Sequence, residues 1–373
     1  MKTCRNLYSE LCSFENIYQA YRAARRGKRA TEAVAAFEYN QEAELLRLRD
    51  EMRAQTWQPG GYHSFYIHDP KRRLISAAPF RDRVVHHALI NVLEPIWEQR
   101  FIHDSYANRL AKGTHRALDR CQQFARRWRY VLQCDLQQYF PSIDHAILNA
   151  ELARLVRDDK VLELCDRVIA SGAGVLDEEY GMQWFAGDDL LAALRPRGLP
   201  IGNLTSQFWA NVYLNRFDHF VERQLKCAGY LRYVDDFLLF SDDKAQLQRW
   251  RAEIIGYLAS LRLSLHAGRA QVYPVTNGIP FLGFRAYPDH RRLKRRNGVK
   301  FQRRLRALAG QYARGETNLE QLTASVLGWI NYARYADSWG LRRALLGRWR
   351  LPASTLMRPA SPGAQATAGW KSP

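Results

Sequence analysis

Three aspartates lie at the ends of segments that are otherwise apolar and prone to form strands. Asp135 ends the run 130–135, and Asp235 and Asp236 separate the two apolar halves of the run 231–240. The second pattern predicts a hairpin with two carboxylates at its tip. A hairpin within a sheet can place its tip beside the end of a neighbouring strand. We therefore expect the three carboxylates to lie together.

Such a group of carboxylates is costly unless cations fill it, because like charges repel one another. Mg²⁺ suits it, since this ion prefers hard oxygen ligands. Two ions about 3.5–4 Å apart would activate a hydroxyl nucleophile and stabilise a leaving pyrophosphate. An Asp-Asp pair is also common in ordinary turns. Spacing alone therefore supports a metal-site hypothesis and nothing narrower.

The charge balance of the chain favours a polyanionic partner. Its 373 residues carry 56 Lys and Arg against 37 Asp and Glu, a net charge of +19 with a pI near 9.9. Solubility or a preference for membrane surfaces would be the alternatives. The basic residues, however, recur along the chain, which favours nucleic acid; the clusters are 22–29, 71–73, 126–129, 291–296 and 342–350.

Neither the cysteines nor the hydropathy point to an extracellular or membrane protein. The six cysteines show no C-x-x-C spacing and no Cys/His cluster typical of zinc. Free thiols in a reducing compartment are expected. Residues 1–20 lack the apolar run of a signal peptide, and no stretch is long enough to span a bilayer. We expect a cytoplasmic protein that has no membrane partner.

The elements that must position the aspartates follow from periodicity. Helices are predicted over 16–52, 82–97, 204–226 and 245–261, strands over 64–67, 73–77 and 130–135, and short strands over 279–284 and the segment after it. Residues 172–200 read as a loop. From residue 301 the composition changes to that of a small helical bundle, and 351–373 reads as a mobile tail.

Several ordered motifs resemble those of reverse transcriptases. The segment 233–236 (YVDD) resembles the Y-x-D-D box, and 130–144 resembles the preceding catalytic-strand motif. Residues 73–77 with 80–85 resemble the fingers motif, and 281–284 (FLGF) the primer-grip region. The resemblance runs from about Tyr62 to Phe284.

This resemblance implies an α+β right-hand polymerase, with an antiparallel palm sheet and an α-helical thumb. The expected domains are an N-terminal helical extension over 1–60, fingers and palm over 61–290, a thumb over 291–350 and a flexible tail over 351–373. The implied activity is RNA-directed DNA polymerisation, with template RNA, primer, cDNA and dNTPs as partners.

One motif narrows the family. Residues 200–207 (PIGNLTSQ) stand where most reverse transcriptases carry Pro-Gln-Gly, and they resemble the signature of diversity-generating retroelement enzymes. Those enzymes copy a template-repeat RNA with errors at adenines, which diversifies a target gene. They act with a small basic accessory protein that forms a homopentamer. The alternatives are a group II intron, retron or antiviral defence enzyme, and a non-catalytic RNA-binding protein with the same fold.

The resemblance also assigns roles to single residues. Asp135, Asp235 and Asp236 would be catalytic and, together with Leu136, would form the site of two Mg²⁺ ions. Tyr139 would act as the gate against a 2′-hydroxyl, with Phe140 as the alternative if the register differs. The expected nucleotide contacts also include Arg73, Lys71, Ile201, Gly202 and Gln207, and the expected primer and template contacts are Tyr233, Leu282 and Gly283.

Two departures from the family pattern bear on mechanism. Ile201 stands where a Gln would anchor the nucleotide, so we expect lower fidelity at template adenines. The usual lysine after the hairpin is replaced by Arg269 or His266, and an arginine cannot act as a general acid. We expect both residues to make surface contacts only.

Overall fold

The computed structural model describes residues 4–68, 72–347 and 349. The predictions for Lys71 and for the tail over 351–373 lie outside these residues. The chain divides into two compact units, residues 1–276 and 277–373. The boundaries expected at residues 60, 290 and 350 remain predictions.

The N-terminal region folds as several helices where one was predicted. They are α1 (Tyr8–Leu11), α2 (Phe14–Ala24), α3 (Glu32–Tyr39) and α4 (Gln41–Arg53). The predicted helix over 16–52 is interrupted at 25–31, where Gly27 adopts a φ of 72°. Helix α2 packs along α5 (Phe80–Glu98), and the buried Asn16 side chain donates to the Ala88 carbonyl at 3.0 Å.

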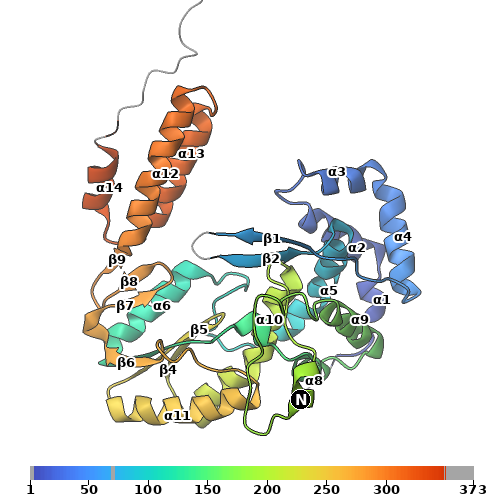
Figure 1. Ribbon diagram of the computed structural model, residues 1–373, viewed down its shortest axis with the longest axis horizontal. Coiled ribbons are helices and arrows are strands. Elements are labelled where there is room, and N and C mark those ends of the chain that lie inside the picture. The colour runs from blue at the N-terminus through green and yellow to red at the C-terminus, as the bar shows by residue number, and fades with distance from the viewer. Residues whose placement is uncertain (1–3, 69–71, 348, 350–373) are drawn as a thin grey trace, which may run out of the picture. The chain divides into compact units, whose positions relative to one another are not determined.

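A two-stranded hairpin follows, formed by β1 (His63–Ile67) and β2 (Arg73–Ala77) (Figure 1). Both strands match the sequence prediction. Strand β1 is exposed along its whole length, whereas Ser76 of β2 is buried. The hairpin therefore joins the rest of the unit through β2.

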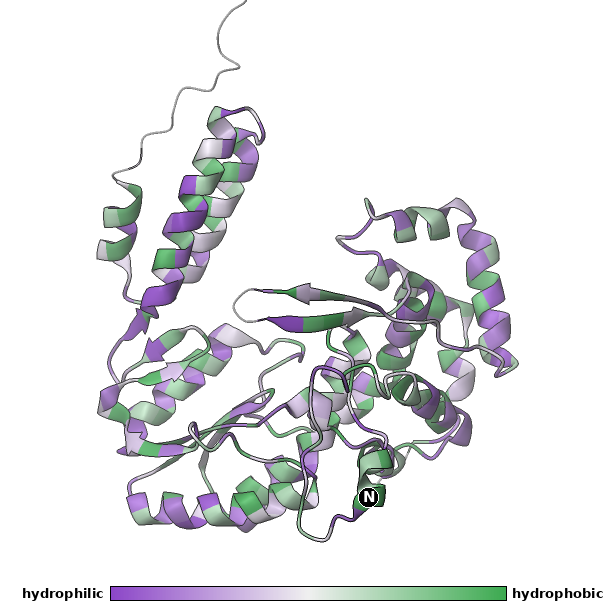
Figure 2. Cartoon of the chain, in the orientation of Figure 1, coloured by the Kyte–Doolittle hydropathy of each residue, from purple (hydrophilic) through white to green (hydrophobic). Residues whose placement is uncertain are grey.

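The central sheet of the first unit has the order β4-β5-β3-β6 and is antiparallel throughout. Its strands are β3 (Tyr130–Asp135), β4 (Gly229–Tyr233), β5 (Asp236–Ser241) and β6 (Gln271–Pro274). Helices α6 (Thr114–Arg127) and α11 (Lys244–Ser260) cover its two faces (Figure 1). Helix α11 alternates between hydrophilic and hydrophobic residues (Figure 2), because one side of it is buried against the sheet.

The remaining helices of this unit are α7 (Tyr139–Ser142), α8 (His145–Ala153), α9 (Asp159–Ala170) and α10 (Leu204–His219). Asp144 caps α8, accepting from the Ile147 amide at 3.0 Å. Twelve of the sixteen residues of α10 are buried. A helix buried on every side forms the centre of a core, and α10 has that position here.

The second unit begins with a small antiparallel sheet of β7 (Ile279–Phe281), β8 (Phe284–Ala286) and β9 (Arg291–Leu293). It continues with α12 (Arg295–Ala313), α13 (Leu319–Ala333) and α14 (Trp339–Leu346). Phe301 of α12 stacks on Trp329 of α13 with ring centroids 3.9 Å apart. The predicted helical bundle is present, and the α+β class is confirmed. No helix within the described ranges is long and apolar enough to cross a membrane.

Candidate active site

Sheet register brings the three aspartates together. Asp135, the last residue of β3, lies opposite Asp236, the first residue of β5. Asp236 also lies opposite Tyr233 of β4, so Asp235 occupies the connection between these two strands. The Leu136 amide donates to the Asp235 carbonyl at 3.2 Å. The hairpin tip therefore lies against the end of β3, as the apolar runs in the sequence predicted.

The hairpin connection contains an unusual backbone conformation. Val234 has a φ of 58°, in the left-handed region. A β-branched residue rarely adopts this region. The conformation costs of the order of 1–3 kcal/mol and persists only where the surroundings impose it. The Arg232 guanidinium donates to the Val234 carbonyl at 3.0 Å, and the Tyr233 hydroxyl lies 3.1 Å from that of Thr114. These contacts hold the turn that presents Asp235.

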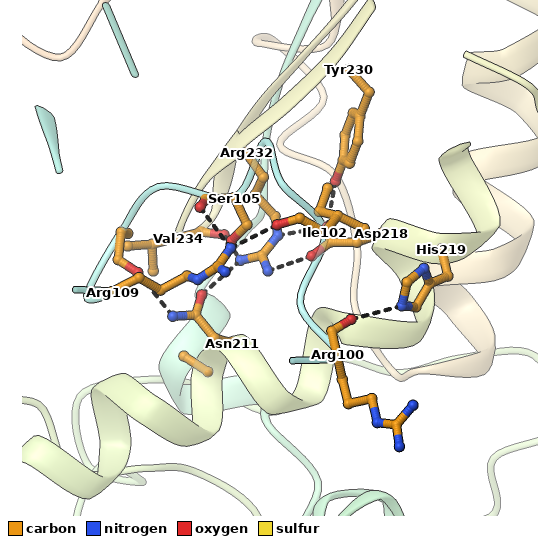
Figure 3. A network of polar contacts seen from close by, with 12 residues as sticks. Arg100, Ile102, Ser105, Arg109, Asn211, Asp218, His219, Tyr230, Arg232 and Val234 are labelled. Atoms are coloured by element: carbon orange, nitrogen blue, oxygen red, sulfur yellow. Dashed lines mark hydrogen bonds and ion pairs between the residues drawn. The ribbon is translucent and has the colours of Figure 1, made fainter. Parts of the chain in front are cut away.

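Arg232 belongs to a buried ion pair. Its guanidinium donates to both carboxylate oxygens of Asp218, at 2.7 and 2.6 Å, and to Asn211 at 3.2 Å. Both partners are fully buried, and Tyr230 also donates to Asp218 (Figure 3). Burial opposes the charge of Arg232, but the charge and hydrogen bonds of Asp218, together with Tyr230 and Tyr139, keep the guanidinium pKa above its usual range. Helix α10 therefore anchors the hairpin through Asp218 and Asn211.

A second segment completes this support along the open edge of β4. The Arg232 amide donates to the Asp104 carbonyl at 2.9 Å, and the Tyr106 amide donates to the Arg232 carbonyl at 3.0 Å. Arg109 then donates to the carbonyls of Ile102 and Ser105, at 2.7 and 3.0 Å (Figure 3). Residues 104–106 thus cover an edge that would otherwise expose unpaired backbone groups.

The electrostatics of the carboxylates reflect their crowding. Burial and the neighbouring Asp135 both raise the pKa of Asp235, while Arg73 and Arg269 act in the opposite direction. Arg269 forms an ion pair with Asp135. The expectation that Arg269 makes surface contacts only is therefore wrong, because its guanidinium reaches the candidate site. His266 contributes through its backbone, whose amide donates to the Asp135 carbonyl at 2.8 Å.

The carboxylate oxygens fit Mg²⁺ in chemical type. In the part of the chain that the structure describes, however, no group of three or more His, Cys, Asp or Glu side chains could hold a metal ion. Asp135 is paired with the Arg269 guanidinium instead. Binding of ions at Asp135 would require Arg269 to release it. The backbone of Leu136, also expected in the metal site, is hydrogen-bonded to Asp235.

Of the two aromatic residues considered as the sugar gate, the structure favours Phe140. Tyr139 is only 2% exposed, and its hydroxyl donates to the Ala210 carbonyl. A side chain held inside the core cannot contact a nucleotide, so its assignment as the gate is corrected. Phe140 is half-buried and remains the candidate. Gln138, just before α7, has a left-handed φ of 47°. This residue ends the alternation of the strand, so the side chain of Tyr139 turns into the core.

The other residues expected at the nucleotide lie around β2 and the start of α10. Arg73 begins β2, is exposed, and is close enough to Asp235 to lower its pKa. The Ile201 carbonyl accepts from the Ser76 amide at 2.9 Å. A Cβ on Gly202 would lie 2.8 Å from the Ile75 side chain, so this position requires glycine. Gln207, on the first turns of α10, is half-buried.

Two residues of the same motif act as a tether, which motif comparison did not reveal. The Asn203 side chain accepts from the Ala78 amide at 3.1 Å and donates to the Ser76 and Pro200 carbonyls, at 2.8 and 3.2 Å. The Ser206 hydroxyl donates to the Pro200 carbonyl at 2.7 Å. Both side chains are buried. They fasten the loop before α10 to the end of β2.

The expected primer contacts divide between the two units. Tyr233 lies on the β4–β5 hairpin, whereas Leu282 and Gly283 form the turn between β7 and β8. Gly283 has a φ of 89°, and the Asn297 side chain donates to its carbonyl at 3.0 Å. This turn is therefore well fixed within the second unit, and its role toward a primer remains a prediction.

The chain is similar in sequence to known proteins. A family model described as reverse transcriptase (RNA-dependent DNA polymerase) matches residues 67–286. Protein YkfC of Escherichia coli K12 is 29% identical over 284 residues, which cover 65% of this chain and 71% of that protein. The group II intron-encoded protein LtrA of Lactococcus lactis subsp. cremoris is 24% identical over 48% of this chain and 28% of its own length. A solved structure of apo telomerase from Candida tropicalis superposes with a TM-score of 0.47 and 12% identity, over 65% of this chain and 50% of that one.

Proposed function

Because this chain belongs to the reverse transcriptase family of RNA-directed DNA polymerases, we propose that Asp135, Asp235 and Asp236 form its catalytic centre. The observation that carries the proposal is the register that sets Asp135 opposite Asp236 at the tip of the β4–β5 hairpin. The raised pKa of Asp235 supports it, since crowded carboxylates whose pKa values are perturbed are characteristic of functional sites.

Different residues take different parts in nucleotide addition. Two Mg²⁺ ions at the carboxylates would supply activation of the primer hydroxyl and stabilisation of the leaving pyrophosphate. Arg73, with Lys71, binds the triphosphate of the incoming dNTP. Phe140 lies under the sugar and excludes a 2′-hydroxyl. Arg269, which pairs with Asp135, would have to release this carboxylate for an ion to be held there, and as an arginine it cannot serve as the general acid.

Primer extension on a primed RNA in the presence of Mg²⁺ tests the proposal. Wild-type protein should incorporate dNTPs, and Asp235→Asn should abolish incorporation while RNA binding persists. A wild-type protein that binds primed RNA but extends nothing would identify it as a non-catalytic RNA-binding protein instead.

We further propose that the enzyme copies a template-repeat RNA in the cytoplasm, with errors at adenines, and that it works with a small basic pentameric accessory protein. The motif 200–207 and Ile201 support this assignment. A hydrophobic residue at 201 offers no hydrogen bond to hold the nucleotide, so mismatches are penalised less. The test is cDNA sequencing with and without the neighbouring basic protein. Ile201→Gln should lower the error rate at adenines, and an unchanged rate would refute this role.

Similarity to intron-encoded and intron maturase proteins favours a second candidate, a reverse transcriptase of group II intron descent. Its RNA partner would be structured intron RNA rather than a repeat. Accurate copying of adenines that does not depend on any accessory protein would support this second candidate.

A further inference from the structure

A cavity of ≈ 500 Å³ opens in the first unit among residues of α5, α8, α10 and α11. Its size falls within the range of about 300–1,000 Å³ that is usual for ligand sites. Part of its lining comes from η2 (Phe220–Gln224), a π-helical turn that directly continues α10. Such turns are rare and often mark functional positions.

The lining is strongly cationic. Four arginines contribute to it, Arg100, Arg154, Arg216 and Arg223, together with one acid, Glu151. Glu151 is buried, and its carboxylate lies 3.2 Å from Arg216 and 3.8 Å from Arg154. Within the lining itself the arginines outnumber the single acid. The cavity therefore favours an anion, and planar guanidinium groups suit phosphate.

Two buried acceptors in the same lining point to a ligand that also carries hydroxyl groups. His219 lies 2.9 Å through Nε2 from the Arg100 carbonyl (Figure 3). A carbonyl only accepts, so Nε2 donates to it, and on an imidazole that carries this one proton Nδ1 is an acceptor. Nδ1 of His219 and Oδ1 of Asn215 have no hydrogen-bond partner among the described residues. A phosphate cannot satisfy an acceptor, whereas a hydroxyl can.

We propose that this cavity binds a single-stranded segment of RNA. Its phosphates contact the arginines, and a ribose 2′-hydroxyl donates to His219 or Asn215 once the exposed arginine side chains move aside. The 2′-hydroxyl is the group that distinguishes RNA from DNA at a protein surface. The proposal rests on the proposed function, because it takes RNA as the partner.

The cavity is separate from the candidate active site. Its lining includes the last turn of α10. Residues 201–207 lie before and on the first turn, about 22 Å away along a helix that rises 1.5 Å per residue. A strand bound here would hold template RNA at a distance from the reacting end. It would therefore add affinity for RNA without altering the chemistry.

Titration of a fluorescent 20-nucleotide RNA, and of DNA of the same sequence, at several salt concentrations tests the proposal. The variant is Arg216→Gln with Arg223→Gln, because both side chains are exposed and the buried Glu151 keeps Arg154 as a partner; a urea titration checks that the variant folds. The control is Arg47→Gln with Arg249→Gln, which removes the same charge from exposed positions elsewhere. Extension of a short primed homopolymer is measured on the same preparations.

Removing two phosphate contacts should lower the slope of log affinity against log salt by about 1.4, from about 0.7 per contact on a single strand. The wild type should prefer RNA to DNA, and the control pair should bind as the wild type does. Unchanged affinity and slope in the variant would overturn the site, and equal wild-type affinity for RNA and DNA would overturn its assignment to RNA. Failure of extension by the wild type would instead count against the polymerase proposal.

Discussion

Replacing Arg232 with methionine tests whether the buried pair with Asp218 positions the catalytic hairpin. The substitution keeps a long side chain but leaves Asp218 charged and fully buried. Breaking such a pair from one side costs roughly 3–5 kcal/mol. Domains of this kind have about 5–15 kcal/mol of stability in total. The variant should therefore fold, with a clearly lower free energy of unfolding in a urea titration.

The informative comparison is the double variant Arg232→Met with Asp218→Asn. It contains no unpaired buried charge, and the amide can still accept from Tyr230. Most of the lost stability should return. The polymerisation rate should not return, because the Val234 carbonyl still lacks its donor. A hydrogen bond from a charged donor is worth about 1.5–3 kcal/mol, so the rate should remain at least about tenfold low.

Single-turnover primer extension under saturating nucleotide measures this rate. The matched control is Arg249→Met, which breaks the exposed pair with Asp243 and should change neither stability nor rate appreciably. Recovery of both stability and rate in the double variant would refute the positioning role. Arg232 would then matter only as the counter-charge of Asp218.

Three further predictions concern the same site. Burial and Asp135 raise the pKa of Asp235, so its ionised form destabilises the fold, and Asp235→Asn should raise the melting temperature at pH 7. This gain should disappear below the ordinary carboxyl pKa, where the wild-type carboxyl is protonated as well. A gain in melting temperature that does not depend on pH would contradict this reasoning. Phe140→Ala should increase ribonucleotide incorporation, whereas Tyr139→Phe should leave it unchanged and cost only about 0.5–1.5 kcal/mol, because the Ala210 carbonyl keeps its partner within α10; the reverse pattern in a nucleotide-competition assay would restore Tyr139 as the gate. Asn203→Ala should cost about 2–3 kcal/mol in chemical unfolding, from three lost buried hydrogen bonds of about 1 kcal/mol each, and a loss below about 0.5 kcal/mol would contradict the tether.

The parts of the site that could be predicted from sequence are those set by local patterns. Apolar runs ending in carboxylates located both strand ends, and the hairpin interrupted by Asp235 and Asp236 formed at the expected place. Strands β2 and β3 have the predicted bounds. Such features depend on alternation within a few residues, which the sequence contains directly.

The parts that could not be predicted depend on partners distant in sequence. Arg232 is charged, and charged residues are rarely fully buried, so nothing local pairs it with Asp218 on a helix. The choice between Tyr139 and Phe140 depended on the left-handed Gln138, which ends the strand alternation. Asn203 was part of a recognised motif, but its tethering role is visible only beside β2. The one local signal available was Arg232 itself, a charge inside an apolar strand.

Helix α10 has a consequence for how such an enzyme can change over evolutionary time. Its first turn is tied to β2 through Asn203, and its later turns hold the catalytic hairpin through Asp218. A substitution that shifts this helix would disturb both copying accuracy and turnover, and selection would remove it. Ile201 takes part in the link to β2 through its backbone carbonyl, which a change of side chain leaves in place. If Ile201 sets copying accuracy as we propose, accuracy can change at this position while both ends of α10 keep their hydrogen bonds, and an error-prone polymerase can arise without a slow intermediate.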